Sequence, residues 1–121
     1  MRRMMRLGIT EFIDCAHFLP GHVKCGGLHG HTYRVEVAVE GEAKEGGMIV
    51  DFGELRGRVR GVLEEYDHRN WNDVLESPTV ENICELLARR LAERLPFSFV
   101  IRVWEGHGKW AETGSPPRPR A

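Results

Sequence analysis

Four of the six histidines in this chain of 121 residues lie close together in the sequence, as His17, His22, His29 and His31. His29 and His31 begin a segment in which apolar and polar residues alternate, and side chains two apart in a strand share a face. His17 ends an earlier alternating segment, so an antiparallel hairpin of the two segments would bring it beside His29 and His31. Three imidazoles without a thiolate ligand are typical of a catalytic zinc ion whose fourth position is open to water or substrate. The alternative is that backbone carbonyls satisfy these histidines inside the core.

Two further groups could supply acid–base chemistry. Cys25 lies four residues before His29, and as a thiolate it would be a nucleophile or a proton acceptor. The alternative for Cys25 is a small buried residue. Asp67 and His68 are adjacent, and an aspartate beside an imidazole can orient it as a base. The alternative for His68 is a histidine at a helix C-terminus that interacts with the helix dipole.

A carboxylate stands in line with apolar residues near the end of the chain. The segment 97–105 alternates, and Glu105 falls on the same face as Phe99, Ile101 and Val103. A carboxylate on such a face either lies at the solvent end of the strand or is buried for a reason such as ligand recognition.

The elements that must position these residues follow the order strand, strand, helix, helix, strand. Neither face of the first strand is purely polar, which predicts a strand covered on both sides. The second helix opens at Pro78 and Thr79, has Glu81 in its first turn and stops at Pro96. The pattern predicts one α+β domain over residues 1–113, an antiparallel sheet with two helices on one face, and a disordered tail over 114–121. The predicted strands span 7–18, 28–41 and 97–105. The first helix spans 52–66, and a loop follows it over 67–78.

Composition excludes several classes of protein. The net charge is -1 with no block of like charges, so the electrostatic footprint of a nucleic-acid-binding protein is absent. Glu11 and Asp14 interrupt the apolar run that a signal peptide needs, and no segment approaches the roughly 18 apolar residues of a membrane span. The three cysteines, Cys15, Cys25 and Cys84, are expected to be reduced thiols in a cytoplasmic protein.

Six motifs occur in order along the chain: CAHFL, CGGLHGH, GGMIVDFGEL, DHRNWND, SPTVEN and VWEG. In this order they resemble the 6-pyruvoyltetrahydropterin synthase and 6-carboxytetrahydropterin synthase family, over about residues 8–111. The stretch KCGGLHGHTY is more similar to the carboxy-type enzymes of 7-deazaguanine (queuosine and archaeosine) synthesis. The resemblance implies the tunnelling fold (T-fold), a four-stranded antiparallel sheet with two helices, whose subunits join edge to edge into a barrel. The implied homo-oligomer, a trimer or a dimer of trimers (a homohexamer), would close the open edges of so small a sheet.

The resemblance also assigns roles to individual residues. The family's zinc ligands correspond to His17, His29 and His31, and its catalytic cysteine corresponds to Cys25. Its catalytic dyad corresponds to Asp67 and His68, and its pterin-anchoring glutamate to Glu105. A loop that the adjacent subunit usually supplies adds Thr79 and Glu81 to the pterin pocket. Trp71 stands where the family usually has leucine, which predicts a packing change. Gly106, followed by His107, replaces the family's usual threonine, so a hydroxyl is missing from the pterin site.

The implied activity is a zinc-dependent lyase reaction, in which 7,8-dihydroneopterin triphosphate becomes 6-carboxy-5,6,7,8-tetrahydropterin with loss of triphosphate and acetaldehyde. His22, Lys24 and Arg34 are candidates, by position, for holding the triphosphate. One rival is 6-pyruvoyltetrahydropterin synthase, which eliminates triphosphate without breaking a carbon–carbon bond. A rival of another class is a non-catalytic module that binds zinc and pterin, but the presence of Cys25 and of the acid–base groups argues against it.

Overall fold

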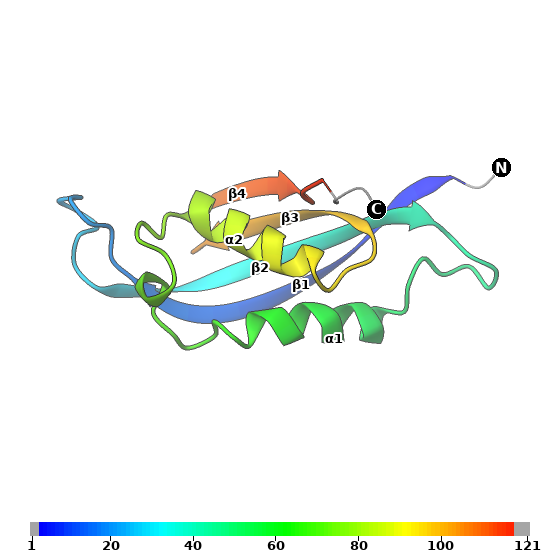
Figure 1. The fold of residues 1–121 in the computed structure, drawn as a ribbon, viewed down its shortest axis with the longest axis horizontal. Helices are drawn as coiled ribbons and strands as arrows, with labels where there is room; N and C mark the ends of the chain where they lie inside the picture. Colours follow the sequence, from blue (N-terminus) through cyan, green and yellow to red (C-terminus); the bar gives the residue numbers. More distant parts are fainter. Residues whose placement is uncertain (1–2, 118–121) are drawn as a thin grey trace.

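A four-stranded antiparallel sheet with strand order β1-β2-β3-β4 is the central layer of the protein. The structure is a computed structural model and describes residues 3–117. Strands β1 and β2 form a long hairpin whose ends reach past the helices (Figure 1). The four strands are β1 (Met4–His17), β2 (His29–Glu42), β3 (Ser98–Glu105) and β4 (Lys109–Gly114).

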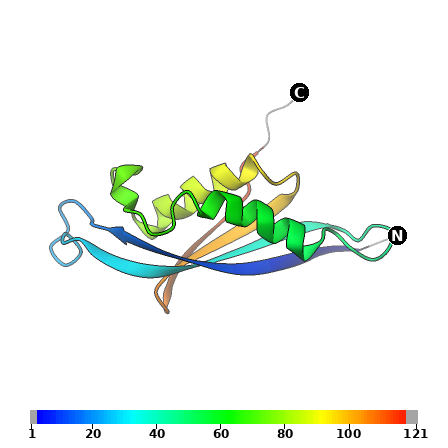
Figure 2. The same ribbon diagram turned by 90° about the horizontal axis from the view of Figure 1, so that it is seen from below.

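Both α-helices lie on the same face of the sheet, as the sequence predicts (Figures 1 and 2). Helix α1 (Phe52–Leu63) begins after Asp51, and helix α2 (Val80–Ala92) begins after Thr79. Each of these two side chains accepts a hydrogen bond from a backbone N–H of the first turn, which satisfies a group that the helix itself leaves unpaired. In the described part of the chain no helix combines the length and the apolar character needed to cross a membrane.

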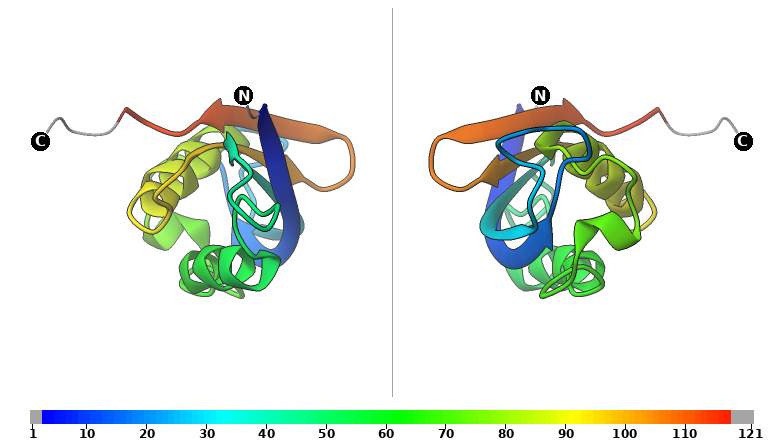
Figure 3. Two further views of the ribbon diagram at one scale, coloured as in Figure 1. Left: turned by 90° about the vertical axis from the view of Figure 1, so that its right-hand side faces the viewer. Right: turned by 90° about the vertical axis from the view of Figure 1, so that its left-hand side faces the viewer.

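The core lies between the sheet and the helices. The face of β1 that carries Ile13 and the face of β2 that carries Tyr33 are paired in register and point toward the helices. Seen end-on, the sheet twists so that β1 and β4 diverge around the helical layer (Figure 3). The opposite face of the sheet is open in this chain, and Phe12 on that face is 57% exposed. The prediction that β1 is covered on both sides is therefore wrong for the single chain.

The segment after α1 differs from the prediction. Helix α1 ends at Leu63 instead of Tyr66, because the chain turns there and leads residues 67–70 to the free edge of β1. The predicted loop contains a short 3-10 helix, η1 (Trp71–Asp73), and the side chain of Trp71 is 1% exposed. A tryptophan in a polar segment therefore belongs to the core.

The C-terminal part contains a fourth strand that the residue pattern does not predict. Strand β4 is short and mostly polar, with the sequence KWAETG, so it lacks the alternation that identifies the other strands. The resemblance, by contrast, implies four strands. Of the predicted tail, Gly114 ends β4 and Ser115 donates a backbone hydrogen bond to Phe99, whereas residues 118–121 lie outside the described part of the chain.

Candidate functional site

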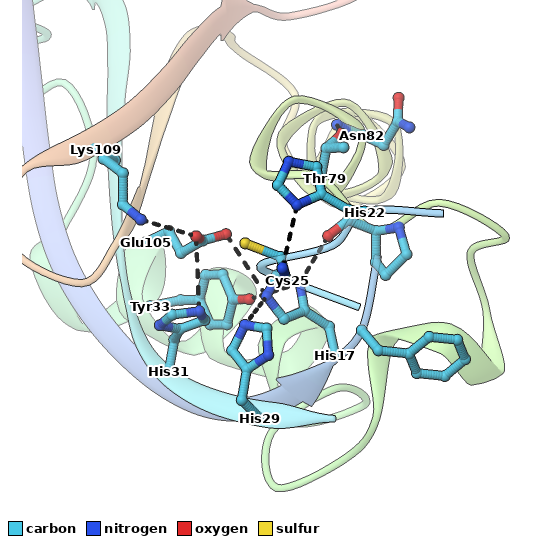
Figure 4. A network of polar contacts seen from close by, with 12 residues as sticks. His17, His22, Cys25, His29, His31, Tyr33, Thr79, Asn82, Glu105 and Lys109 are labelled. Atoms are coloured by element: carbon cyan, nitrogen blue, oxygen red, sulfur yellow. Dashed lines mark hydrogen bonds and ion pairs between the residues drawn. The ribbon is translucent and has the colours of Figure 1, made fainter. Parts of the chain in front are cut away.

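Three histidines meet at one end of the β1–β2 hairpin, on the face that the helices cover (Figure 4). The register pairs His17 with His29, and His31 follows two residues later on the same face. Nε2 of His17 lies 3.0 Å from Nε2 of His29, and one ring nitrogen of each of the three histidines lies within 4.8 Å of the others. His17 is 1% exposed. The structure thus brings together the three residues that the sequence proposes as metal ligands.

The outer ring nitrogens of two of these histidines are held by backbone carbonyls. Nδ1 of His17 lies 2.8 Å from the carbonyl oxygen of Pro78, and Nδ1 of His29 lies 2.7 Å from that of Gly27. A carbonyl only accepts, so both Nδ1 atoms donate, and when both imidazoles are neutral their Nε2 atoms present lone pairs to each other. Lone pairs at this distance repel unless a cation lies between them. Metal-binding histidines in proteins are commonly oriented in this way, and the donor set fits Zn²⁺.

The surroundings of His31 also favour metal binding. Burial lowers the pKa of His31, against the opposing effect of Glu105, which favours the neutral imidazole that binds a metal. Its Nε2 atom is buried and has no hydrogen-bond partner among the described residues. An unpartnered buried nitrogen directed at two other imidazoles is consistent with a ligand that a metal ion would satisfy.

Glu105 borders the histidines on the β3 side. Its neighbours in the sheet register are Tyr33 in β2 and Lys109 in β4. Its carboxylate is 14% exposed and lies 3.9 Å from Nε2 of His17, 3.6 Å from Nε2 of His31 and 3.5 Å from Nζ of Lys109. Of the two alternatives drawn from the sequence, a free solvent end and a carboxylate placed in a site, the structure favours the second.

The turn after Glu105 explains the glycine found in place of the family's usual threonine. Gly106 has a φ of 69°, a left-handed conformation that glycine adopts without steric cost. Its backbone N–H donates to the carbonyl of Thr32 at 3.2 Å, so the turn that begins β4 is tied to β2. The glycine therefore serves the sharp reversal between β3 and β4.

Cys25 lies in the loop that joins β1 to β2. Its backbone N–H donates to Nδ1 of His22 at 3.1 Å, and its carbonyl accepts from Leu19 at 2.9 Å. A Cβ at Gly26 would lie 2.4 Å from the carbonyl oxygen of His22, so the tight turn requires glycine there. The thiol is free and half-buried, and Figure 4 shows the side chain pointing toward the group of histidines and Glu105.

Asp67 and His68 lie elsewhere, at the free edge of β1. The backbone N–H of His68 donates to the carbonyl of Asp14 at 2.6 Å, and the Asp67 carboxylate accepts from Asp14 at 2.9 Å. Asp14 and His17 are three residues apart in a strand, so their side chains point to opposite faces. His68 is 78% exposed and has a φ of 61°, an uncommon conformation for a residue with a side chain. This dyad therefore does not join the histidine site within one chain.

The two members of the dyad contact each other directly. Oδ1 of Asp67 lies 3.0 Å from Nδ1 of His68, and Arg60 donates to the second oxygen at 2.9 Å. Partial burial opposes ionisation of Asp67, but the Asp14 backbone, His68 and Arg60 together hold its pKa below the usual value. An ionised carboxylate on Nδ1 orients the imidazole and leaves its Nε2 facing solvent. Arg60 is a supporting residue that the sequence did not indicate, because nothing in a helical arginine distinguishes it from a surface charge.

Trp71 packs beneath the histidines. Its ring stacks on Tyr66 with the centroids 5.2 Å apart and meets the edge of Tyr33 at 5.9 Å. The hydroxyl of Tyr33 in turn lies 3.5 Å from Nδ1 of His17. The substitution of tryptophan for leucine accordingly enlarges the apolar support of the site.

The start of α2 reaches the site through its backbone. Thr79 caps α2 with its hydroxyl, and Glu81 is exposed in the first turn, whereas the preceding residue Pro78 supplies the carbonyl for His17. Asn72 holds the end of β1 in the same region, since its side-chain amide forms hydrogen bonds with both backbone groups of Phe18 at 2.9 and 3.0 Å. Asn72 lies within the motif DHRNWND, but the residue pattern alone does not predict its contact with Phe18.

Comparison with known proteins identifies the family. The profile of 6-pyruvoyl tetrahydropterin synthase matches residues 6–116. The chain is 43% identical over 112 residues to "Putative 6-carboxy-5,6,7,8-tetrahydropterin synthase" of Archaeoglobus fulgidus, covering 93% of this chain and 97% of that protein. It is 43% identical over 83 residues to "Dihydroneopterin monophosphate aldolase" of Pyrococcus furiosus, covering 66% and 72%. The fold matches that of Caenorhabditis elegans 6-pyruvoyl tetrahydropterin synthase with a TM-score of 0.84 at 21% identity, over 93% of this chain and 97% of that one. The chain therefore belongs to the 6-pyruvoyl tetrahydropterin synthase family of enzymes.

Proposed function

We propose that this enzyme is a zinc-dependent 6-carboxy-5,6,7,8-tetrahydropterin synthase. It converts 7,8-dihydroneopterin triphosphate and one water molecule to 6-carboxy-5,6,7,8-tetrahydropterin, triphosphate and acetaldehyde, and it serves the synthesis of 7-deazaguanines in the cytoplasm. The observation that carries the proposal is the convergence of His17, His29 and His31 on one point, with Glu105 beside them and Cys25 directed toward them. The name of the Archaeoglobus fulgidus relative supports the carboxy-type product.

Each residue of the site has a task that its environment suits. His17, His29 and His31 would hold the zinc ion, which would supply Lewis-acid stabilisation of negative charge on a side-chain oxygen of the substrate. Glu105 accepts the ring N–H groups of the pterin, since a carboxylate can receive two parallel hydrogen bonds. Cys25, as thiolate, takes the proton from the side-chain carbon next to that oxygen. The loop held by His22 keeps the thiol on the side of the histidines.

The dyad acts from a neighbouring copy of the chain. Asp67 and His68 lie at the free edge of β1, next to a side chain on the face opposite the histidines, so they reach a histidine site only where two chains meet. His68, oriented by Asp67, then moves a proton on the other side of the reacting carbon. Thr79 and Glu81 join the pterin pocket from a neighbour in the same manner. The assembly we propose is a trimer or a dimer of trimers, in which neighbours close the open sheet edges.

The test is a product assay with the purified zinc-loaded protein and 7,8-dihydroneopterin triphosphate. The proposal predicts equal amounts of acetaldehyde and 6-carboxytetrahydropterin, identified by mass. A 6-pyruvoyl product without acetaldehyde would assign the pyruvoyl-type reaction instead. Pterin binding without turnover would assign a non-catalytic module. Because one relative is named as an aldolase of the monophosphate, dihydroneopterin monophosphate is the second substrate, and turnover of it alone would overturn the proposal.

A further inference from the structure

We infer that Lys109 determines specificity for the ring of the substrate, by donating a hydrogen bond to the 4-oxo group of a pterin held by Glu105. The inference rests on the proposed function, in which Glu105 anchors the ring. It adds a residue to which neither the motifs nor the resemblance gives a role. The result would be an enzyme that accepts 4-oxo pteridines and rejects 4-amino pteridines.

The position of Lys109 follows from the β3–β4 hairpin. Lys109 is the first residue of β4 and the direct partner of Glu105 in the register, so the two side chains lie on the same face. Nζ lies 3.5 Å from Oε1 of Glu105. The lysine is 73% exposed, so its ammonium group can move from the carboxylate to a ligand without disturbing the core.

The two histidines beside Glu105 would bind the metal ion and so could not donate a hydrogen bond from Nε2 to the pterin. Among the described residues the carboxylate lies within 4.0 Å of Nε2 of His17, Nε2 of His31 and Nζ of Lys109. The Nε2 atoms of His17 and His31 face the shared centre of the three histidines, and in the zinc form they have no proton to donate. Among the described residues Lys109 is then the one positively charged side chain within 4.0 Å of the Glu105 carboxylate.

The hydrogen-bonding edge of a pterin fits the pair of Glu105 and Lys109. A pterin presents two donors side by side, N3–H and the 2-amino group, and the 4-oxo acceptor follows directly after N3–H. When the carboxylate accepts both donors, the 4-oxo group lies just beyond one of its oxygens. Placing N3–H on Oε1 brings the 4-oxo group to Lys109, whereas the reverse orientation would bring it to the side of His17, where no donor remains. A 2,4-diaminopteridine offers no 4-oxo acceptor to Lys109, and its 4-amino group would place donors against the ammonium, which has no acceptor. Its N3 also carries no hydrogen, so Glu105 loses one of its two donors whatever residue stands at 109.

The experiment uses two probes, 6-hydroxymethylpterin and 2,4-diamino-6-(hydroxymethyl)pteridine, with the zinc-loaded full-length protein. The probes differ in both the 4-oxo group and N3–H, so the quantity that tests Lys109 is the effect of each substitution on the binding of each probe. Dissociation constants are measured by calorimetry for the wild type, Lys109→Met, Lys109→Arg and the control Lys44→Met, which removes an exposed lysine from a distant loop. We expect Lys109→Met to weaken pterin binding about fivefold to tenfold, a modest value for a charged hydrogen bond at an exposed site. Binding of the diamino probe should change less than about twofold. Lys109→Arg should retain most of the preference, and Lys44→Met should change nothing.

The outcomes separate this inference from the proposed function. If Lys109→Met weakens both probes equally, the lysine only positions Glu105 and the inference is wrong. If it weakens neither probe, Lys109 has no part in binding and the inference is wrong as well. In both cases pterin binding by the wild type leaves the proposed function standing. Failure of the zinc-loaded wild type to bind 6-hydroxymethylpterin at all would overturn the proposed function itself, and the inference with it.

Discussion

His17 should be the one zinc ligand whose loss also destabilises the fold. It is 1% exposed, and its Nδ1 donates to the buried carbonyl of Pro78 at 2.8 Å. Replacing it with alanine leaves that carbonyl unpaired, at a cost of about 1–3 kcal/mol, and opens a cavity that costs about 1–2 kcal/mol more. We expect His17→Ala to lower the free energy of unfolding of the metal-free protein by about 2–5 kcal/mol. His29→Ala, at a partly exposed position, should cost less than about 1 kcal/mol.

Urea unfolding of the chelator-treated proteins, followed by circular dichroism at one protein concentration, measures this difference. Metal analysis of the same preparations should show that both variants have lost most of their zinc. His17→Asn is the matched control, because its side-chain amide can keep the hydrogen bond to Pro78 while it removes the imidazole. It should regain part of the stability and none of the zinc. Equal free energies of unfolding for His17→Ala and His29→Ala would show that the Pro78 contact does not anchor the site, and a full zinc complement in His29→Ala would refute the metal site.

Turnover, thiol reactivity, the pH dependence of stability and assembly provide four further tests. Cys25→Ala should keep zinc and pterin affinity but lose about 10²–10⁴-fold in kcat, the usual contribution of a positioned acid–base group; near-normal turnover would remove Cys25 from the mechanism. Burial raises the pKa of Cys15 and of Cys84 to about 11 from 9.0, so at pH 8 Ellman's reagent should titrate one thiol per native chain and three in urea. Since the unfolded thiols ionise first, stability should fall as the pH rises from 9.0 toward about 11, which urea midpoints at pH 8 and 10 would measure. Light scattering should report a multiple of three chains, and a stable monomer at micromolar concentration would contradict the shared site.

Most of the fold could be predicted from the sequence because alternation and helical periodicity are local signals. The face of β2 is buried from Tyr33 through Val39 as the alternation predicts, and its first members, His29 and His31, are partly exposed. Strand β4 gave no such signal, because its residues are stabilised by pairing with β3 and not by an apolar face. The burial of Trp71 was equally invisible, since a polar sequence around it is typical of a loop. The strand conformation of β4 and the burial of Trp71 both depend on contacts with residues that are distant in the sequence.

In the candidate site, too, some positions could be predicted from the sequence and others could not. The convergence of His17 with His29 and His31 could be predicted, because hairpin pairing is set by neighbouring segments of the chain. The location of His68 could not, because its place at the edge of β1 depends on hydrogen bonds between residues more than fifty positions apart. Lys109 could not be predicted because it lies beside Glu105 only through the pairing of β4 with β3, and β4 was not predicted from the residue pattern.

The placement of the dyad at a strand edge also has a consequence for genetics. If Asp67 and His68 serve a neighbour's histidine site, Cys25→Ala and His68→Ala are lesions in different halves of one composite centre. A cell that makes both inactive chains would build mixed rings, and some junctions in these rings would join an intact histidine half to an intact dyad. Two null alleles of the same gene would then restore partial enzyme activity together, although neither does so alone. A second allele carrying Cys25→Ala would not rescue the first, so the pattern of rescue between alleles would map the shared site without a structure of the oligomer.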